Sequence, residues 1–284
     1  MSFNEQDRAQ VLAEALPYIQ QFNGKTIVIK YDSSAVPEMM CDDVLSDIIT
    51  LSLVGIRVVL VHGGRVEINS MLARLGKEPH FEDGLRCTDK ETMSIVQQVL
   101  CGQVNKDLVT RINWQGGTAV GLSGLDGITF QARQLDEKYG CVGSISHVDA
   151  SIVASALDKG YIPVVAPVAS SVDGAAACNI DADTAAYKLA VALEAEKLIV
   201  LAGVRGLLRT PGDESSLLHE IQLSSVPALV REGVIAGEMV HKVDCCVNAV
   251  RSGVGSAVIL DGRVSHSLLM ELLTDAGVGT MLTN

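Results

Sequence analysis

Short, β-branched apolar runs alternate with helical patterns along most of the chain. The strand-like runs lie at 25–31, 57–62, 117–121, 162–167, 197–202 and 256–260. Apolar residues recur at helical spacing over 38–54, 65–76, 89–113, 147–159, 183–194, 222–233, 241–252 and 266–275. This alternation predicts an α/β protein: a three-layer αβα sandwich around a central, mainly parallel sheet.

Three local patterns add to this outline. Residues 5–22 carry apolar residues at helical spacing with Pro17 inside the run, which predicts a kinked helix that docks on the body or on a neighbouring subunit. Alternating residues over 127–146 predict a small hairpin, and Thr88 with Glu91 fits a helix-capping box. A polar turn near 170–178 suggests a boundary, so we expect segments 1–22, 23–175 and 176–284.

The composition is that of a compact globular protein. Of the 284 residues, 48% are hydrophobic and 20% charged, and the formal net charge is −12. Such a chain has no surplus of Lys and Arg, so we expect neither nucleic acid nor an anionic membrane as a partner. A small anionic ligand needs only a few local cations and stays compatible with this charge.

The seven cysteines are scattered and include no C-x-x-C, and the six histidines show no paired ligand spacing. This favours free thiols in a reducing compartment over a disulfide framework or a zinc site, and we expect no protein-bound metal. The polar N-terminus is unlike a signal or transit peptide, and no window reaches the ~18 apolar residues of a membrane span. We therefore expect a cytoplasmic protein, or a stromal one if plastid-encoded.

The candidate chemistry lies where predicted strands end. The run 58–62 stops at Gly63-Gly64 and a helical pattern follows at once, which presents backbone N–H groups to an anion such as phosphate. A second strand delivers Lys30 to the same edge of the sheet, but Asp32-Ser33 and not glycine follow it.

Other phosphate motifs do not fit. A Walker loop lacks its first glycine, no G-x-G-x-x-G follows a strand, and the G-x-S-x-G elbow of esterases is absent. Two lysines held by one aspartate suit phosphoryl transfer, and an arginine can grip a carboxylate bidentately. The polar residues at the predicted strand ends are Lys30, Arg86, Asn179, Asp183 and Lys242.

At this point the chain resembles N-acetyl-L-glutamate kinase, of the amino-acid kinase fold, in its arginine-inhibited branch. The similarity covers nearly the whole length. The segments that carry it are Gly84–Asp89, Val104–Val109, Gly121–Gly127, Gly160–Val164, Asn179–Thr184, Ala195–Ile199, Lys242–Cys246 and Ile259–Arg263.

The resemblance implies transfer of the γ-phosphate of ATP to the side-chain carboxylate of N-acetylglutamate, in arginine synthesis. The N-terminal lobe would bind the acyl substrate and the C-terminal lobe the nucleotide, with Mg²⁺ carried by ATP and no prosthetic group. The implied catalytic residues are Lys30, Lys242 and Asp183. The implied substrate-binding residues are Gly64, Arg65, Arg86 and Asn179, and the implied nucleotide-binding residues are Gly203, Gly206, Leu207, Gly237 and Met239.

The resemblance also implies feedback inhibition by arginine and a ring-like homohexamer in which N-terminal helices interlace. In photosynthetic lineages the family binds the nitrogen-signalling PII protein, which is therefore suggested as a partner. The implied arginine-site residues are Tyr18, Lys197, His266, Glu271 and Gly277.

The sequence departs from the family where the chemistry lies. The family expects glycines at the positions of Asp32, Ser33, Arg65 and Glu238, Thr-Asp at Ala202-Gly203, Asn at Asp181 and Pro at His241. An alternative is therefore a weak or inactive member that binds arginine as a regulatory or structural subunit. A kinase of the same fold acting on aspartate, carbamate or a nucleotide fits less well. We also hypothesise that Asp32 and Arg65 form an ion pair in the space that phosphate occupies in relatives.

Overall fold

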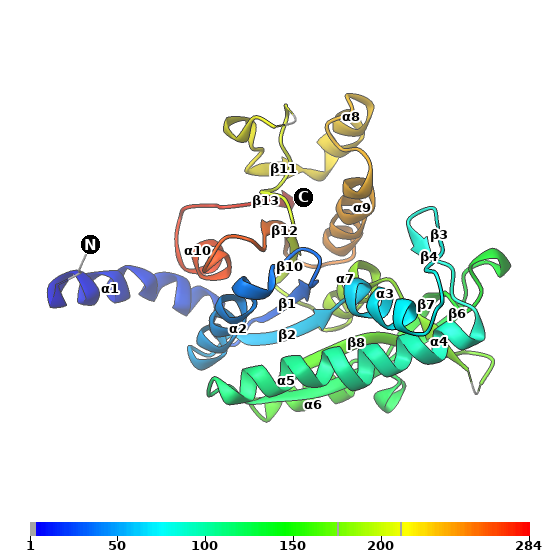
Figure 1. The fold of residues 1–284 in the computed structure, drawn as a ribbon. Coiled ribbons are helices and arrows are strands. Elements are labelled where there is room, and N and C mark those ends of the chain that lie inside the picture. The colour runs from blue at the N-terminus through cyan, green and yellow to red at the C-terminus, as the bar shows by residue number, and fades with distance from the viewer. Residues whose placement is uncertain (1–3, 175, 211) are drawn as a thin grey trace.

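The computed structural model describes residues 4–174, 176–210 and 212–284 (Figure 1). Strands and helices alternate as the apolar pattern predicts. The α-helices are α1 (Glu5–Phe22), α2 (Glu38–Leu53), α3 (Arg65–Arg74), α4 (Lys90–Gln97), α5 (Asn105–Trp114), α6 (Ser151–Asp158), α7 (Ala182–Ala192), α8 (Val226–Arg231), α9 (Glu238–Arg251) and α10 (Ser267–Leu273). A π-helical stretch, Gln98–Val104, joins α4 to α5, and short 3₁₀ turns lie at Asp126–Ile128, Glu137–Tyr139, Glu214–Ser216 and Leu223–Ser225.

The main sheet runs in the order β11-β13-β12-β10-β1-β2-β8-β6-β7, and β5 and β9 also pair with β8. Its strands are β1 (Thr26–Tyr31), β2 (Arg57–His62), β5 (Ala119–Gly124), β6 (Phe130–Gln134), β7 (Gly143–Val148), β8 (Ile162–Ser171), β9 (Ala177–Asn179), β10 (Lys197–Ala202), β11 (Glu220–Gln222), β12 (Ser256–Asp261) and β13 (Thr280–Thr283). A separate small hairpin joins β3 (Phe81–Glu82) to β4 (Leu85–Arg86). The central pairs β12–β10, β10–β1, β1–β2 and β2–β8 are parallel, and β12–β13, β6–β7 and β8–β9 are antiparallel.

Helices cover both faces of this sheet. One buried apolar cluster joins the sheet to α2, α3, α4, α5 and α10, and a second joins the opposite face to α6, α7, α8 and α9. Side chains of β1 alternate between the two clusters, with Ile27 and Ile29 in the first and Val28 in the second. The three-layer αβα prediction is confirmed.

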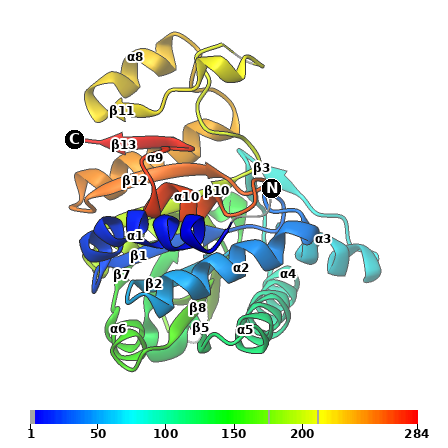
Figure 2. The same ribbon diagram turned by 90° about the vertical axis from the view of Figure 1, so that its left-hand side faces the viewer.

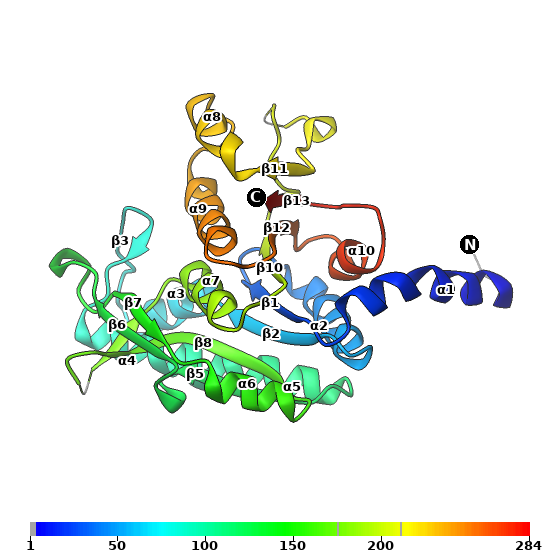
Figure 3. The ribbon, with the colours of Figure 1, turned by 180° about the vertical axis from the view of Figure 1, so that it is seen from behind.

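Helix α1 is continuous through Pro17 and packs at its C-terminal end against α10. Its N-terminal end extends away from the body in Figures 1 and 3, and Figure 2 views the molecule from that side. Val11, Leu12 and Leu16 on it are more than half exposed. Within the described residues, no helix is long and apolar enough to cross a bilayer.

Of two local predictions, the hairpin is confirmed and the helix-capping box is wrong. The hairpin predicted within 127–146 is present as β6 and β7. The capping box is wrong: Asp89 caps α4 by accepting from the Thr92 amide at 2.7 Å, while the Thr88 hydroxyl donates to the Arg86 carbonyl. The N-cap therefore lies one residue later than predicted, and a carboxylate there also suits the helix dipole.

Candidate active site

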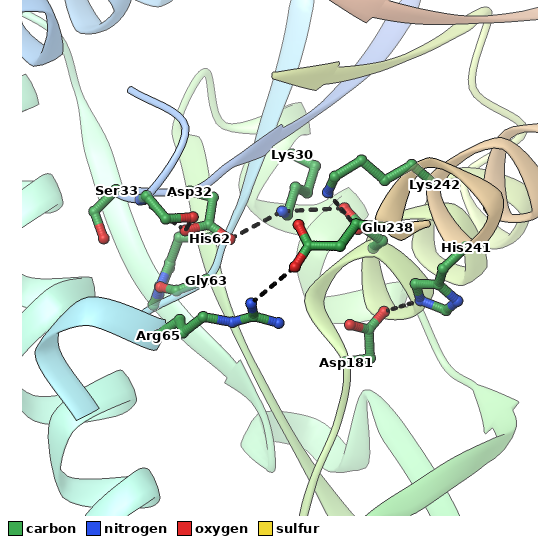
Figure 4. Close-up of polar contacts among 12 residues, drawn as sticks. Lys30, Asp32, Ser33, His62, Gly63, Arg65, Asp181, Glu238, His241 and Lys242 are labelled. Atoms are coloured by element: carbon green, nitrogen blue, oxygen red, sulfur yellow. Dashed lines mark hydrogen bonds and ion pairs between the residues drawn. The ribbon is translucent and has the colours of Figure 1, made fainter. Parts of the chain in front are cut away.

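Lys30, Asp183 and Lys242, from β1, α7 and α9, converge in one cluster of ion pairs. Figure 4 shows the ammonium groups of Lys30 and Lys242 close together in this cluster. Lys30 follows Val28 in the alternation of β1, so its side chain emerges on the face that α7 and α9 cover. Its Nζ lies 3.1 Å from Asp183 Oδ1, and Lys242 Nζ donates to Asp183 Oδ2 at 2.8 Å. Each oxygen of one carboxylate thus pairs with a different ammonium group.

Burial makes this arrangement electrostatically strong. The side chains of Lys30 and Asp183 are 3% and 7% exposed. Burial opposes the charge of Asp183, but Lys30 and then Lys242 outweigh it and hold the pKa of that carboxyl far below its usual range. Burial likewise opposes the charge of Lys30, and Asp183 and Asp32 raise its pKa above the ordinary value. Asp183 and Lys30 are therefore charged at neutral pH, as charge stabilisation in phosphoryl transfer requires.

Asp32 is a further partner of Lys30. Its Oδ2 accepts from Lys30 Nζ at 3.1 Å, and its Oδ1 accepts from the Ser34 amide and hydroxyl at 2.9 and 2.8 Å. Tyr31 pairs with His62 in the sheet, so Asp32 lies directly beside Gly63. A Cβ added to Gly63 would lie 2.9 Å from Asp32 Oδ2. The carboxylate therefore occupies the edge of the predicted phosphate turn.

The hypothesis of an Asp32–Arg65 ion pair is wrong. Asp32 turns toward Lys30, whereas Arg65 Nη1 reaches Glu238 Oε1 at 3.7 Å. Arg65 begins α3 and Glu238 begins α9, so this contact joins the starts of two helices across the site (Figure 4). Neither helix has a side-chain cap, and exposed helix N-termini favour anions.

The buried side chains of His62 and Asn105 form hydrogen bonds beneath the turn at Gly63-Gly64. His62 is fully buried, and burial lowers its pKa to about 4. Its Nε2 lies 3.2 Å from Asn105 Nδ2 and its Nδ1 lies 2.9 Å from the Gly63 carbonyl, so the neutral ring donates through Nδ1 and accepts through Nε2. Asn105 also donates to the carbonyls of Leu122 and Val164. His62 ends the strand-like run 58–62 and Asn105 lies in the segment Val104–Val109, both of which were recognised from the sequence. Their role in supporting the turn follows only from the fold.

Arg86 and Asn179 lie on a second side of the site. Arg86 is 7% exposed, its Nη2 donates to Asn69 Oδ1 at 2.7 Å, and its guanidinium stacks on Phe81 at 4.7 Å. Its buried Nη1 has no hydrogen-bond partner among residues 4–174, 176–210 and 212–284. Burial and, second, the nearby Arg65 lower the pKa of Arg86 to about 10. A carboxylate ligand would satisfy this arginine.

A cavity of about 440 Å³ opens beside Arg86. Thr88 lines it too, and Asn179 Nδ2 donates to the Thr88 hydroxyl at 3.2 Å. Lys30, Asp183 and Lys242 are not among its lining residues, so this cavity does not include the lysine pair. Gly64 is the N-cap of α3, and a Cβ there would meet Leu100 at 2.6 Å.

The predicted nucleotide residues cluster around β10 and α9. Gly203 follows β10, and the Leu207 amide donates to the Thr280 hydroxyl at 2.8 Å. Gly206 and Gly237 have φ of 140° and 57°, where a side chain would be strained. Gly237 is the N-cap of α9, and Met239 lies in its first turn.

The residues predicted for arginine lie on or beside α1, α10 and β10: Tyr18 on α1, Lys197 at the start of β10, His266 and Glu271 at the N-cap and on α10, and Gly277 after α10. Lys197 Nζ pairs with Glu271 Oε1 at 3.0 Å in a nearly buried contact, and His266 Nδ1 lies 2.7 Å from Asp47 Oδ1. Tyr18 lies beside Asp275, whose carboxylate raises the pKa of the phenol. The Gly277 carbonyl lies 2.9 Å from His219 Nδ1.

Comparisons with known proteins show the family to which the chain belongs. Residues 25–261 match the model of the amino acid kinase family. The chain is 48% identical to "Acetylglutamate kinase" of Thermosynechococcus vestitus, covering 98% of this chain and 95% of that protein. It is 50% identical to the protein of the same name from Synechocystis sp., covering 97% and 93%.

Among solved structures, N-acetylglutamate synthase of Neisseria gonorrhoeae in complex with coenzyme A and N-acetyl-glutamate superposes with a TM-score of 0.85 at 30% identity. The alignment covers 97% of this chain and 63% of that one. Isopentenyl phosphate kinase shares the fold, with a TM-score of 0.66 at 21% identity over 91% of this chain and 100% of that chain. The chain belongs to the amino acid kinase family, in its acetylglutamate kinase branch.

Proposed function

We propose that this chain phosphorylates the side-chain carboxylate of N-acetyl-L-glutamate with ATP, as a step of arginine synthesis. The observation that carries the proposal is the sharing of one buried carboxylate, Asp183, by Lys30 and Lys242. The relatives named acetylglutamate kinase, 47–50% identical over nearly their whole length, supply the substrate.

In this proposal each group has a part in the reaction. A carboxylate oxygen of acetylglutamate attacks the γ-phosphorus, an O–P bond forms, and the bond from that phosphorus to the bridging oxygen breaks, giving an acyl phosphate and ADP. Lys30 and Lys242 stabilise the charge on the transferring group, and Asp183 fixes their spacing. Arg86 and Asn179 grip the substrate beside Gly64 and Arg65. Mg²⁺ enters with the nucleotide as part of the substrate.

The nucleotide is proposed to bind against Gly203, Gly206, Leu207, Gly237 and Met239 in the C-terminal lobe (176–284), with acetylglutamate in the N-terminal lobe (23–175). The uncapped start of α9 offers N–H groups to phosphates. Glu238 opposes this by placing a carboxylate at the same helix start.

Phosphoryl transfer is tested by coupled measurement of acetylglutamate-dependent ADP release. Lys242→Ala should reduce kcat by at least about 10²-fold because it removes a charge that acts on the transition state. Lys188→Ala is the matched control, since Lys188 lies on α7 with its ammonium stacked on Tyr187 at 5.3 Å. Equal rates for the two variants would contradict the proposal.

A second candidate function is an arginine-binding regulatory or structural subunit with little catalysis. Asp32 favours it, because this carboxylate neutralises part of Lys30 at the phosphate turn. Arginine binding is supported by the pairs Lys197–Glu271 and His266–Asp47, which supply charged groups for it. It is also supported by a structure of the Neisseria gonorrhoeae synthase in complex with coenzyme A and L-arginine, which superposes with a TM-score of 0.81 at 29% identity. Arginine binding by calorimetry together with absent turnover would establish this candidate over the kinase.

Assembly is part of the proposal. The exposed Val11, Leu12 and Leu16 on the projecting α1 suit burial against the same helix of a second copy, in a homohexamer. Light scattering of Leu12→Glu against the unchanged chain tests this, because the charge blocks an apolar interface. Association with a PII-type signal protein is tested separately by co-elution in gel filtration.

A further inference from the structure

Asp181, His241 and Cys245 form a compact cluster that the proposed kinase reaction does not use. His241 Nε2 lies 2.8 Å from Asp181 Oδ1 and 3.8 Å from Cys245 Sγ. All three donor atoms lie within 4.8 Å of one another. Figure 4 shows His241 directed at Asp181 across the gap between α9 and the start of α7.

The backbone explains why these groups meet. His241 and Cys245 are four residues apart on α9, so they share one face of the helix. Asp181 is the N-cap of α7, and its Oδ1, the oxygen that faces His241, also accepts from the Thr184 amide at 2.8 Å. Two helices therefore contribute, and the carboxylate is already oriented by its capping bond.

The donor set is that of a zinc-class site. Imidazole nitrogen and thiolate sulfur favour Zn²⁺ or Co²⁺ over Mg²⁺ and Ca²⁺, which prefer oxygen. Donors around tetrahedral zinc lie about 3.3–3.8 Å apart, given bonds of about 2.0–2.3 Å. The His241–Cys245 distance already fits, and the His241–Asp181 distance needs to open by about half an ångström. The side chains of Asp181 and His241 are 29% and 49% exposed, which leaves them free to adjust.

We propose that Asp181, His241 and Cys245 bind one divalent cation of the zinc class, with water in the fourth position. The proposal is independent of the kinase activity. Without the ion, the hydrogen bond between His241 and Asp181 satisfies both groups, and this is the state with which the metal competes. The site is easily overlooked in the sequence because Asp181 lies sixty residues before His241.

The position of the site gives the ion a consequence. Asp181 precedes Asp183 by two residues, and His241 directly precedes Lys242. A bound ion would join the starts of α7 and α9, the helices that carry Asp183 and Lys242. It would therefore fix the spacing of that pair.

The test uses the full chain freed of metal by a chelator and titrated with Co²⁺. A thiolate–cobalt charge-transfer band that saturates at one equivalent, and that Zn²⁺ removes by competition, is expected. Cys245→Ser should abolish the band, and His241→Gln should weaken Co²⁺ binding at least about tenfold. Asp181→Asn keeps an N-cap acceptor and should also weaken binding, which covers the case in which Cys245→Ser fails to fold.

Two control variants make the assignment specific. His80, Glu82 and Cys87 form the other three-donor cluster found among the described residues, so Cys87→Ser should leave the band unchanged. Cys141→Ser removes a half-buried thiol outside both clusters and should also leave it unchanged. Absence of a thiolate–cobalt band, its persistence in His241→Gln and Asp181→Asn, or its loss in Cys87→Ser would overturn the proposal.

Discussion

Replacing Asp32 by Asn should make the chain a faster kinase. The substitution keeps the shape of the side chain and removes one negative charge from the phosphate turn. Asp32 Oδ2 lies 3.1 Å from Lys30 Nζ. A phosphoryl oxygen bound to that ammonium at about 2.8 Å would lie within about 6 Å of the carboxylate. At an effective dielectric constant of about 20, each unit of phosphate charge is then repelled by about 3 kcal/mol.

Relief of this repulsion corresponds to a gain of up to about 100-fold in kcat/KM for ATP. Lys30 keeps its ion pair with Asp183 in the variant, so the site retains its geometry. The assay is coupled ADP release at saturating acetylglutamate over a range of ATP concentrations. Asp158→Asn is the charge-matched control, because Asp158 pairs with Arg57 at the start of β2, the end of the strand that lies away from the phosphate turn.

An increase of at least about tenfold in Asp32→Asn, with Asp158→Asn unchanged, is the expected result. If kcat/KM stays the same or falls in Asp32→Asn, the carboxylate does not act on the phosphoryl group. The explanation that Asp32, which stands where the family expects glycine, weakens phosphoryl transfer would then be wrong.

Further predictions concern the rest of the site. Asp183→Asn should reduce kcat at least about 10²-fold and lower the free energy of unfolding by about 3–5 kcal/mol, measured by urea denaturation, because it leaves the buried Lys30 and the partly buried Lys242 short of a counter-charge. A double-mutant cycle with Arg65→Ala and Glu238→Ala should give a coupling below about 1 kcal/mol in the same measurement, since both side chains are about half exposed or more; a larger coupling would make this pair a structural lock. The pKa of His62 is about 4 in the fold, below its ordinary value, so its contribution to stability is present above pH 6.5 and is lost as the pH falls toward 4. Between pH 7 and 4.5 the unchanged chain should lose roughly 2–3 kcal/mol more than His62→Gln, and equal losses would contradict the burial argument. Arginine at about 100 times its Kd should stabilise the chain by about 2.7 kcal/mol, and Glu271→Gln should remove most of this effect in thermal unfolding; an equal shift in both would place the arginine elsewhere.

The apolar pattern predicted the fold well because parallel strands buried on both faces leave a strong signal. The central strands β1, β2 and β10 begin within one residue of their predicted positions. Strands β11 and β13, at one side of the sheet, were missed, since three or four residues carry too little periodicity. The short hairpin β3–β4 is missing from the prediction for the same reason.

The sequence predicted which residues lie at the site better than it predicted which of them contact one another. Strand adjacency is enough to bring Asp32 beside Gly63, but it does not decide which cation the carboxylate meets. The turn after β1 directs Asp32 back to Lys30 through its hydrogen bonds to Ser34, and Arg65 is left for Glu238. Such choices depend on side-chain rotamers, which a sequence pattern does not encode.

The measurement that tests the central claim most directly is acetylglutamate-dependent ADP release by the unchanged chain beside Lys30→Ala. The pairing of Lys30 and Lys242 through Asp183 predicts turnover that requires both ATP and acetylglutamate and falls at least about 10²-fold in the variant. Turnover that survives the loss of Lys30 would contradict the account, and so would its absence from both proteins.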